Sequence, residues 1–177
     1  MISPRRTLVF SNSLLLRWFA VEGATTYRVR VAGAGVNWET LVSEPFAIYE
    51  GTLLQPGQMY LVSVDADNGT ASSTTVFSTV NEAQRTQIQQ QLDLLDAMAL
   101  DDSQRAISEA RIYADSGAMA DAIEVLEAQV RAGSDNAEVY CLLASLYQQH
   151  YGTLDLADLY TELLNQVDRL GETCTTP

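Results

Sequence analysis

The spacing of apolar residues changes near Asn81, and the change divides the chain into two halves with different predicted structures. Before Asn81, apolar and polar residues alternate, and turn signals recur along the chain. After Asn81, apolar residues recur at every third or fourth position, and Gly and Pro become rare. A period of two is typical of half-buried strands, and a period near 3.6 is typical of helices with one buried stripe. We therefore expect a β module, residues 1–80, followed by a helical module, residues 81–177.

Three strands in the first half each have a clear inward face. The predicted inward residues are Leu14, Leu16 and Trp18, then Tyr27, Val29 and Val31, then Tyr60, Val62, Val64 and Ala66. Weaker strand patterns cover residues 36–43, 46–50 and 72–79. About seven short strands at this spacing are typical of an antiparallel β-sandwich.

Turn signals separate these strands at Glu22-Gly23, Gly33-Ala34-Gly35, Pro56-Gly57 and Asn68-Gly69. The pair Asn68-Gly69 predicts a hairpin with a type I′ turn, in which both central residues have positive φ. The segment from Asp65 is weakly similar to a calcium loop, but Gly69 comes one position early and no Glu follows at the needed spacing. We therefore expect a hairpin turn here and no metal site.

One segment of the β half carries a family resemblance. The run from Leu54 to Ala66 matches the Leu-x-Pro-x-x-x-Tyr-x-Val-x-Val-x-Ala segment of fibronectin type III domains. Trp18 matches the buried strand-B Trp of that family, and residues 18–29 resemble the bacterial version of its strands B and C. The resemblance covers roughly residues 3–80. It implies that Tyr60 belongs to a tyrosine corner and that the Pro56-Gly57 turn leads into the sixth strand.

Five helices are predicted in the second half, at about 82–99, 103–115, 119–132, 137–150 and 154–170. The first has the stripe Ile88, Leu92, Leu95 and Ala99, and the last has Leu156, Leu159, Leu163, Val167 and Leu170. Short connections between helices favour antiparallel hairpins.

Cap residues support these helix boundaries. Asp101-Asp102 caps the second helix in this interpretation, and Gly133 ends the third. Asp135 and Glu138 have capping-box spacing before the fourth helix.

Segments 103–132 and 137–170 repeat each other at a lag near 34 residues, with a one-residue shift after His150. Ala106, Ala110, Tyr113, Gly117, Ala122 and Leu126 correspond to Tyr140, Ala144, Tyr147, Gly152, Ala157 and Tyr160. A helix-turn-helix period of 34 is typical of tetratricopeptide (TPR) repeats. The runs Ala144–Tyr147 and Ala120–Leu126 resemble the first-helix and second-helix cores of that family.

Several departures from the TPR pattern leave a generic helical bundle as the alternative. No closing Pro occurs near Ser134, one residue is inserted near Tyr151, and Ala106 replaces the expected large residue. Two repeats are also fewer than the three that normally make a stable stack. We therefore expect either a packed interface between the two halves or a homodimer.

Charge narrows the classes of partner. The net charge is −13, and residues 81–177 carry 17 acids against five Arg, whereas residues 1–80 carry six acids against five Arg. An acidic helical half disfavours nucleic acid and anionic membrane as partners.

No stretch approaches the ~18 apolar residues of a membrane span, so we expect no membrane insertion. We expect a bacterial periplasmic or extracellular protein whose signal peptide was removed before Met1; the sequence leaves a cytoplasmic location open.

The two cysteines are Cys141, inside a helical pattern, and Cys174, in the tail. One pair in a chain of this length is not a disulfide framework. We expect Cys141 to be a small core residue, and a bridge to Cys174 is the alternative.

The residues that most enzymes need are missing. His150 is the single His, which removes His-based triads and multi-His metal sites within one chain. No nucleophile elbow or phosphate-binding loop occurs, and Gly33-x-Gly35 lacks the third Gly of a dinucleotide site. We therefore predict no enzyme activity, no catalytic residue, no metal and no cofactor; the alternative that the residues leave open is a hydrolase that uses carboxylates alone.

The TPR resemblance implies a concave face lined by the first helix of each repeat. Carried over by position, the candidate partner-binding residues are Ile107, Arg111, Ala114, Glu138, Cys141, Ser145 and Gln148. A second candidate set is Tyr113, Tyr140, Tyr147, Tyr151 and Tyr160, although helical spacing places them more often in a core.

The expected fold class is thus α+β multidomain, a fibronectin type III-like sandwich followed by TPR-like helical hairpins. The expected function is a non-enzymatic protein–protein interaction or scaffold protein with a protein or peptide partner. One alternative is an accessory region of a larger enzyme or sensor. Another is a carbohydrate-binding module that uses exposed aromatic residues such as Trp38 and Tyr49 on the sandwich.

Overall fold

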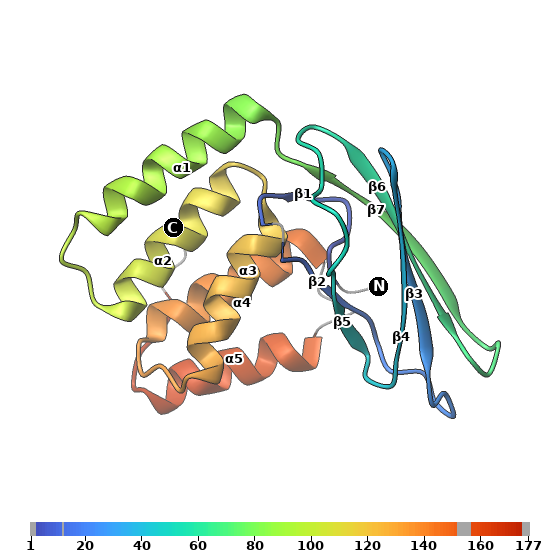
Figure 1. The fold of residues 1–177 in the computed structure, drawn as a ribbon. Helices are drawn as coiled ribbons and strands as arrows, with labels where there is room; N and C mark the ends of the chain where they lie inside the picture. Colours follow the sequence, from blue (N-terminus) through green and yellow to red (C-terminus); the bar gives the residue numbers. More distant parts are fainter. Residues whose placement is uncertain (1–2, 12, 152–156, 175–177) are drawn as a thin grey trace. The chain divides into compact units, whose positions relative to one another are not determined.

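The computed structural model describes residues 3–11, 13–151 and 157–174. The chain divides into two compact units, Met1–Thr86 and Gln87–Pro177. All strands lie in the first unit and the helices follow them, so the fold is of the α+β class (Figure 1). The boundary falls within the first helix, one turn after it begins.

The first unit contains two sheets (Figure 1). The strands are β1 Leu8–Val9, β2 Leu15–Arg17, β3 Tyr27–Gly33, β4 Val36–Val42, β5 Phe46–Ile48, β6 Met59–Ala66 and β7 Ser72–Thr79. Five of them form a sheet in the order β1-β7-β6-β3-β4, and β2 pairs with β5. All pairs are antiparallel except β1 with β7. The three clear strands and the three weaker ones predicted from the alternation are therefore confirmed.

Aromatic pairs organise the core of the first unit. Trp18 meets Tyr27 edge to face, with 5.4 Å between ring centroids, and Tyr60 stacks on Phe77 at 5.5 Å. The inward residues predicted from the sequence are buried in every case: Leu14, Leu16, Trp18, Tyr27, Val29, Val31, Tyr60, Val62, Val64 and Ala66. Burial of large apolar side chains is the main favourable term in folding such a unit.

The buried hydroxyl of Tyr60 fixes the turn before β6. It accepts a hydrogen bond from the Gln55 N–H at 2.7 Å. The carbonyl of Gln55 in turn accepts from the buried Thr79 hydroxyl at 2.6 Å. A buried tyrosine hydroxyl needs such a partner, and here the partner lies in the backbone five residues upstream.

The hairpin predicted at Asn68-Gly69 is confirmed, because β6 and β7 pair antiparallel across it, but the predicted type I′ turn is wrong. Gly69 has φ 68°, but Asn68 is not among the residues with positive φ, and the β6–β7 loop is wider than two residues. The Asn68 side-chain Oδ1 accepts a hydrogen bond from the Thr70 N–H instead. A two-residue loop with positive φ at both positions does occur at Ala34 (45°) and Gly35 (83°), between β3 and β4.

The helices are α1 Glu82–Asp96, α2 Asp102–Asp115, α3 Met119–Arg131, α4 Ala137–Tyr151 and α5 Ala157–Arg169 (Figure 1). From α2 to α5, each helix packs against the next, and α2 also packs against α4. Five helices at the predicted places are confirmed, although α1 ends before the predicted residue 99. The predicted start of α5 and its Leu156 lie outside the described residues.

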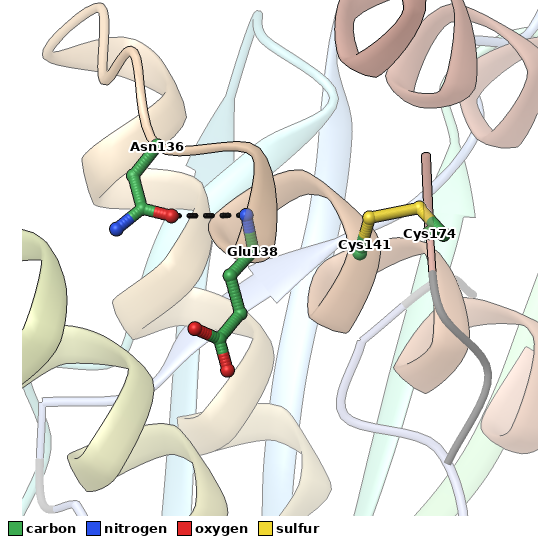
Figure 2. The surroundings of a disulfide bond; sticks show 4 residues. All are labelled: Asn136, Glu138, Cys141 and Cys174. Carbon is green, nitrogen blue, oxygen red and sulfur yellow. Dashed lines mark hydrogen bonds between the residues drawn. A yellow bond between two sulfur atoms is a disulfide. The ribbon is translucent and has the colours of Figure 1, made fainter. Parts of the chain in front are cut away.

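Side-chain caps set several helix ends. Asn81 and Gln84 bond reciprocally at the start of α1, and Asp101 and Gln104 form the predicted cap of α2. The prediction for α4 is wrong by one residue, because the Glu138 N–H donates to the Asn136 side chain at 2.9 Å (Figure 2). Since α4 begins at Ala137, the capping position is that of Asn136, and Asp135 comes too early.

The core of the second unit combines small and large residues. Alanines are buried beside larger side chains in α2, α3 and α4, which lets the helices approach closely: Ala106, Ala110, Ala120, Ala122 and Ala144. In α5, Leu163 and Val167 of the predicted stripe are buried. The stripe predicted for α1 is only partly confirmed, because Ile88 is buried but Ala99 is exposed and lies beyond the end of the helix.

Among the described residues, no helix combines the length and apolar character that crossing a membrane requires.

Candidate functional site

The face shared by α2 and α4 carries an ion pair between two predicted binding residues. The Arg111 Nη2 lies 2.5 Å from the Glu138 Oε1. The two side chains are 58% and 53% exposed, so solvent and a partner can reach both. The ion pair joins α2 to α4, which are separated in sequence by α3. Because α2 packs against α4, the two helices contribute to one surface.

Six of the seven predicted partner-binding residues separate into three groups by exposure. Arg111, Glu138 and Gln148 are exposed, and Ala114 and Ser145 are half-buried. The Ser145 hydroxyl accepts from the Gln149 side chain one turn later. Ile107 is 4% exposed, because close helix packing covers it, so it lies beneath this surface. We call Arg111, Ala114, Glu138, Ser145 and Gln148 the α2/α4 face.

Cys141 is neither a core residue nor a free contact residue. It forms a disulfide with Cys174, with a Cα–Cα distance of 5.4 Å (Figure 2). The expectation of a small buried core cysteine is therefore wrong, and the bridged alternative holds. The bond ties the segment after α5 to the first half of α4 across a sequence separation of 33 residues.

The buried acids of α3, Asp121 and Glu127, have interaction partners within the fold. Glu127 is 7% exposed, accepts a hydrogen bond from the Tyr147 hydroxyl, and lies 3.5 Å from the Arg131 guanidinium. Asp121 is 6% exposed and has interaction partners as well. A carboxylate whose oxygens are occupied in this way stabilises a crossing between helices.

The tyrosines of the second candidate set lie in the core wherever their side chains are described. Tyr113, Tyr140 and Tyr147 are each at most 7% exposed. Burial raises the pKa of Tyr113, and the nearby charges of Glu109 and Asp121 raise it further. Tyr140 donates to the Ser134 carbonyl at 2.6 Å. These three residues therefore offer no binding surface.

The first unit has an open hollow of about 520 Å³ beside β4 and β5. Its lining is Trp38, Thr40, Leu41, Val42, Ser43, Glu44, Phe46, Ala47, Ile48 and Glu50. Trp38 is half-buried and packs against Tyr49, with 5.1 Å between ring centroids. Tyr49 is 3% exposed, and its hydroxyl donates to the Thr52 carbonyl. The expectation of an exposed Tyr49 is thus wrong. Of the two expected aromatic residues, Trp38 lines the hollow and Tyr49 does not.

A second hollow, of about 450 Å³, lies beside the N-terminal segment and β7. It combines Arg5 and Arg6 with the hydroxyl residues Ser73, Thr74 and Thr75. Guanidinium and hydroxyl groups donate hydrogen bonds to anions.

The loop that weakly resembles a calcium site is held by neutral donors. The Asp67 carboxylate accepts from the N–H and hydroxyl of Thr25 and from those of Thr26, at 2.6 to 3.2 Å. These bonds lower the pKa of Asp67 from its ordinary 3.8 to about 2. Within the described part of the chain, no group of three or more His, Cys, Asp or Glu side chains could hold a metal ion.

Comparisons of the sequence with known proteins identify no relative. The chain matches no protein-family model, and no curated protein matches it significantly in sequence. The observations that bear on function are therefore the surfaces of the two units themselves.

Proposed function

We propose that this protein is a non-enzymatic adaptor that binds a protein or peptide partner on the α2/α4 face. One observation carries the proposal: α2 packs against α4 as well as α3, and the exposed Arg111–Glu138 pair lies across α2 and α4. Two neighbouring helices with accessible polar side chains form a surface on which an extended segment or a partner helix can lie.

The packing order supports a TPR-like arrangement of the second unit. In such an arrangement, each repeat contributes two helices, and the first helices of adjacent repeats contact each other. Here α2 and α3 form one pair, α4 and α5 form the next, and α2 contacts α4. Buried alanines such as Ala110 and Ala144 supply the small residues at close crossings.

Strand order and one hydrogen bond support a fibronectin type III-like sandwich in the first unit. We propose that the β2–β5 pair packs face to face with the five-stranded sheet. The N-terminal segment pairs with both sheets, since Ser3 bridges to Arg17 of β2 and β1 pairs with β7. The bond from Gln55 to Tyr60 has the geometry of a tyrosine corner.

The α2/α4 face suits a partner of mixed charge. Arg111 can bind a carboxylate and Glu138 can bind a basic group, once each releases the other. Releasing them costs little, because exposed ion pairs contribute only about 0–1 kcal/mol. The acidic helical half makes nucleic acid an unsuitable partner.

We also propose an oxidising compartment, periplasmic or extracellular, as the site of action. The Cys141–Cys174 disulfide supports this location, because disulfides are rare in the reducing cytosol. Recovery of the chain with both thiols reduced from its native compartment would contradict it.

The direct test is co-purification of partners with the full-length chain and with two charge-reversed variants. Arg111→Glu should abolish retention of the partner. Arg169→Glu is the matched control, because Arg169 lies on α5, is 60% exposed and also forms an ion pair, with Glu162. Equal retention by both variants, or by neither, would place the binding surface elsewhere.

A further inference from the structure

The outer edge of β4 is open. β4 is the last strand of the five-stranded sheet and pairs only with β3 among the described residues. Its seven residues make it a long edge, compared with the three residues of β5. Unpaired edges of this length are templates for pairing with another chain.

The positions of the free backbone groups follow from the hairpin. Because the β3–β4 loop has two residues, Gly33 and Val36 form the hydrogen-bonded pair that flanks it. Hydrogen-bonded and non-hydrogen-bonded pairs alternate along an antiparallel ladder. Asn37, Glu39 and Leu41 therefore direct their N–H and C=O groups away from β3.

The usual protections of an edge strand are missing from β4. Proteins blunt such edges with Pro, Lys, bulges or charges, and residues 36–42 contain neither Pro nor Lys. Its one charged residue, Glu39, is held by Arg30 of β3 at 2.6 Å. The pairing of β4 with β3 is continuous over all seven residues, so no bulge twists the edge away.

A hollow lined by both apolar and polar residues lies beside this edge. Trp38 and Leu41 of β4 line it together with Phe46 and Ile48 of β5. Leu41, Phe46 and Ile48 are 63%, 46% and 51% exposed. Exposed large apolar side chains gathered in one place mark an interaction surface.

Charge indicates which chain would pair there. Glu44 and Glu50 also line the hollow, and both are exposed and form no ion pair with the described residues. A second copy is a poor occupant, because antiparallel pairing of β4 with itself over its full length places Glu39 opposite Glu39. Like charges directly opposite each other destabilise a sheet.

We propose that β4 binds an extended peptide segment of another protein by strand addition. The peptide pairs with the backbone of Asn37, Glu39 and Leu41, places apolar side chains from alternate positions in the hollow, and carries Lys or Arg facing Glu44 and Glu50. This site is separate from the α2/α4 face and does not depend on it.

Selection from a displayed library of random twelve-residue peptides, on the full-length chain, supplies the probe. The enriched peptides should show alternating apolar residues and at least one Lys or Arg. In amide hydrogen exchange followed by NMR, a selected synthetic peptide should slow exchange at Asn37, Glu39 and Leu41 by about tenfold or more. Exchange at Trp38 and Thr40, which already bond to β3, should change little. Failure to enrich such peptides, or protection elsewhere in the chain, would overturn the proposal.

Two substitutions of Leu41 separate the contribution of its backbone N–H to peptide binding from that of its side chain. Leu41→Pro and Leu41→Ala both lose the leucine, but only the first loses the outward N–H; proline is tolerated at such edge positions. Leu41→Pro should bind the selected peptide about tenfold more weakly than Leu41→Ala. Equal affinities, or a dimer of the free chain that Leu41→Pro dissociates, would overturn strand addition by a peptide.

The charge contribution is tested by a double variant that leaves the backbone of β4 unchanged and does not depend on the folding of Leu41→Pro. Glu44→Lys combined with Glu50→Lys changes only exposed side chains. This double variant should bind the selected basic peptide about tenfold more weakly. Unchanged affinity in the double variant would contradict the predicted charge preference.

Discussion

Tyr60 and Gln55 are joined by a buried hydrogen bond, in which the Gln55 N–H donates to the Tyr60 hydroxyl at 2.7 Å. The Gln55 carbonyl accepts from the buried Thr79 hydroxyl, so both backbone groups of one turn residue are satisfied by side chains. The turn before β6 is therefore fixed to the start of β6 and the end of β7.

Tyr60→Phe should destabilise the first unit by about 1–3 kcal/mol, because it leaves the Gln55 N–H without its partner. Urea unfolding followed by tryptophan fluorescence measures the change, since both tryptophans, Trp18 and Trp38, lie in this unit. Thr74→Val is a suitable control: Thr74 is exposed, and its loss should cost less than about 0.5 kcal/mol. Equal effects of the two substitutions would refute the role of the hydrogen bond.

Reduction of the Cys141–Cys174 disulfide should lower the stability of the second unit by about 3–4 kcal/mol, as expected for a loop of this length. Denaturant unfolding with and without a reductant, followed by circular dichroism at the helix band, measures it. The double variant Cys141→Ser/Cys174→Ser should unfold like the reduced chain and should not respond to reductant. An unchanged midpoint on reduction would show that the bond does not constrain this unit.

Asp67 should make the first unit sensitive to acid. Its folded pKa, about 2, lies below its ordinary 3.8, so the carboxylate contributes stability above pH 4. That contribution should disappear as the pH falls from about 4 to 2. Thermal unfolding across this range should show a smaller pH dependence in Asp67→Asn than in the natural chain. A titration of Asp67 near 3.8 by carbon-detected NMR would contradict the prediction.

The alternation and the helical period were sufficient to predict the strands and helices, because most of these elements bury one regular face; α1, in which only Ile88 is buried, is an exception. Trp18, Tyr27 and Tyr60 are core residues for this reason. The turn type at Asn68 could not be read in the same way. The side-chain bonds of Asp67 to Thr25 and Thr26 span more than 40 residues, and they compete with the tight turn that Asn-Gly favours locally.

The candidate site was less predictable than the fold. Position in a repeat places Ile107 and Arg111 on one helix, but it does not tell which of the two the neighbouring helices cover. The Cys141–Cys174 bond forms because α5 packs against α4 and brings the following segment near Cys141. A local sequence pattern does not predict this tertiary arrangement. Tyr49 follows a strand whose alternation was too short to assign its inward face.

The Arg111–Glu138 pair should contribute little to stability even though it marks the proposed binding face. In a double-mutant cycle with Arg111→Ala and Glu138→Ala, the coupling energy should be about 0.2–1 kcal/mol at low salt and should fall as NaCl is added. The exposed pair Arg169–Glu162 provides the comparison on α5. A coupling above about 2 kcal/mol would mean that Arg111 and Glu138 are structural residues and not an accessible surface.

Site-specific photo-crosslinking tests the adaptor proposal most directly. A photoreactive amino acid at Gln148, which is exposed on the α2/α4 face, should give a defined adduct with one partner in an extract of the source organism. The same group at Asp168, exposed on α5, should not, and Arg111→Glu should abolish the Gln148 adduct. Equal adducts from both positions, or a Gln148 adduct that persists in Arg111→Glu, would contradict partner binding on the α2/α4 face.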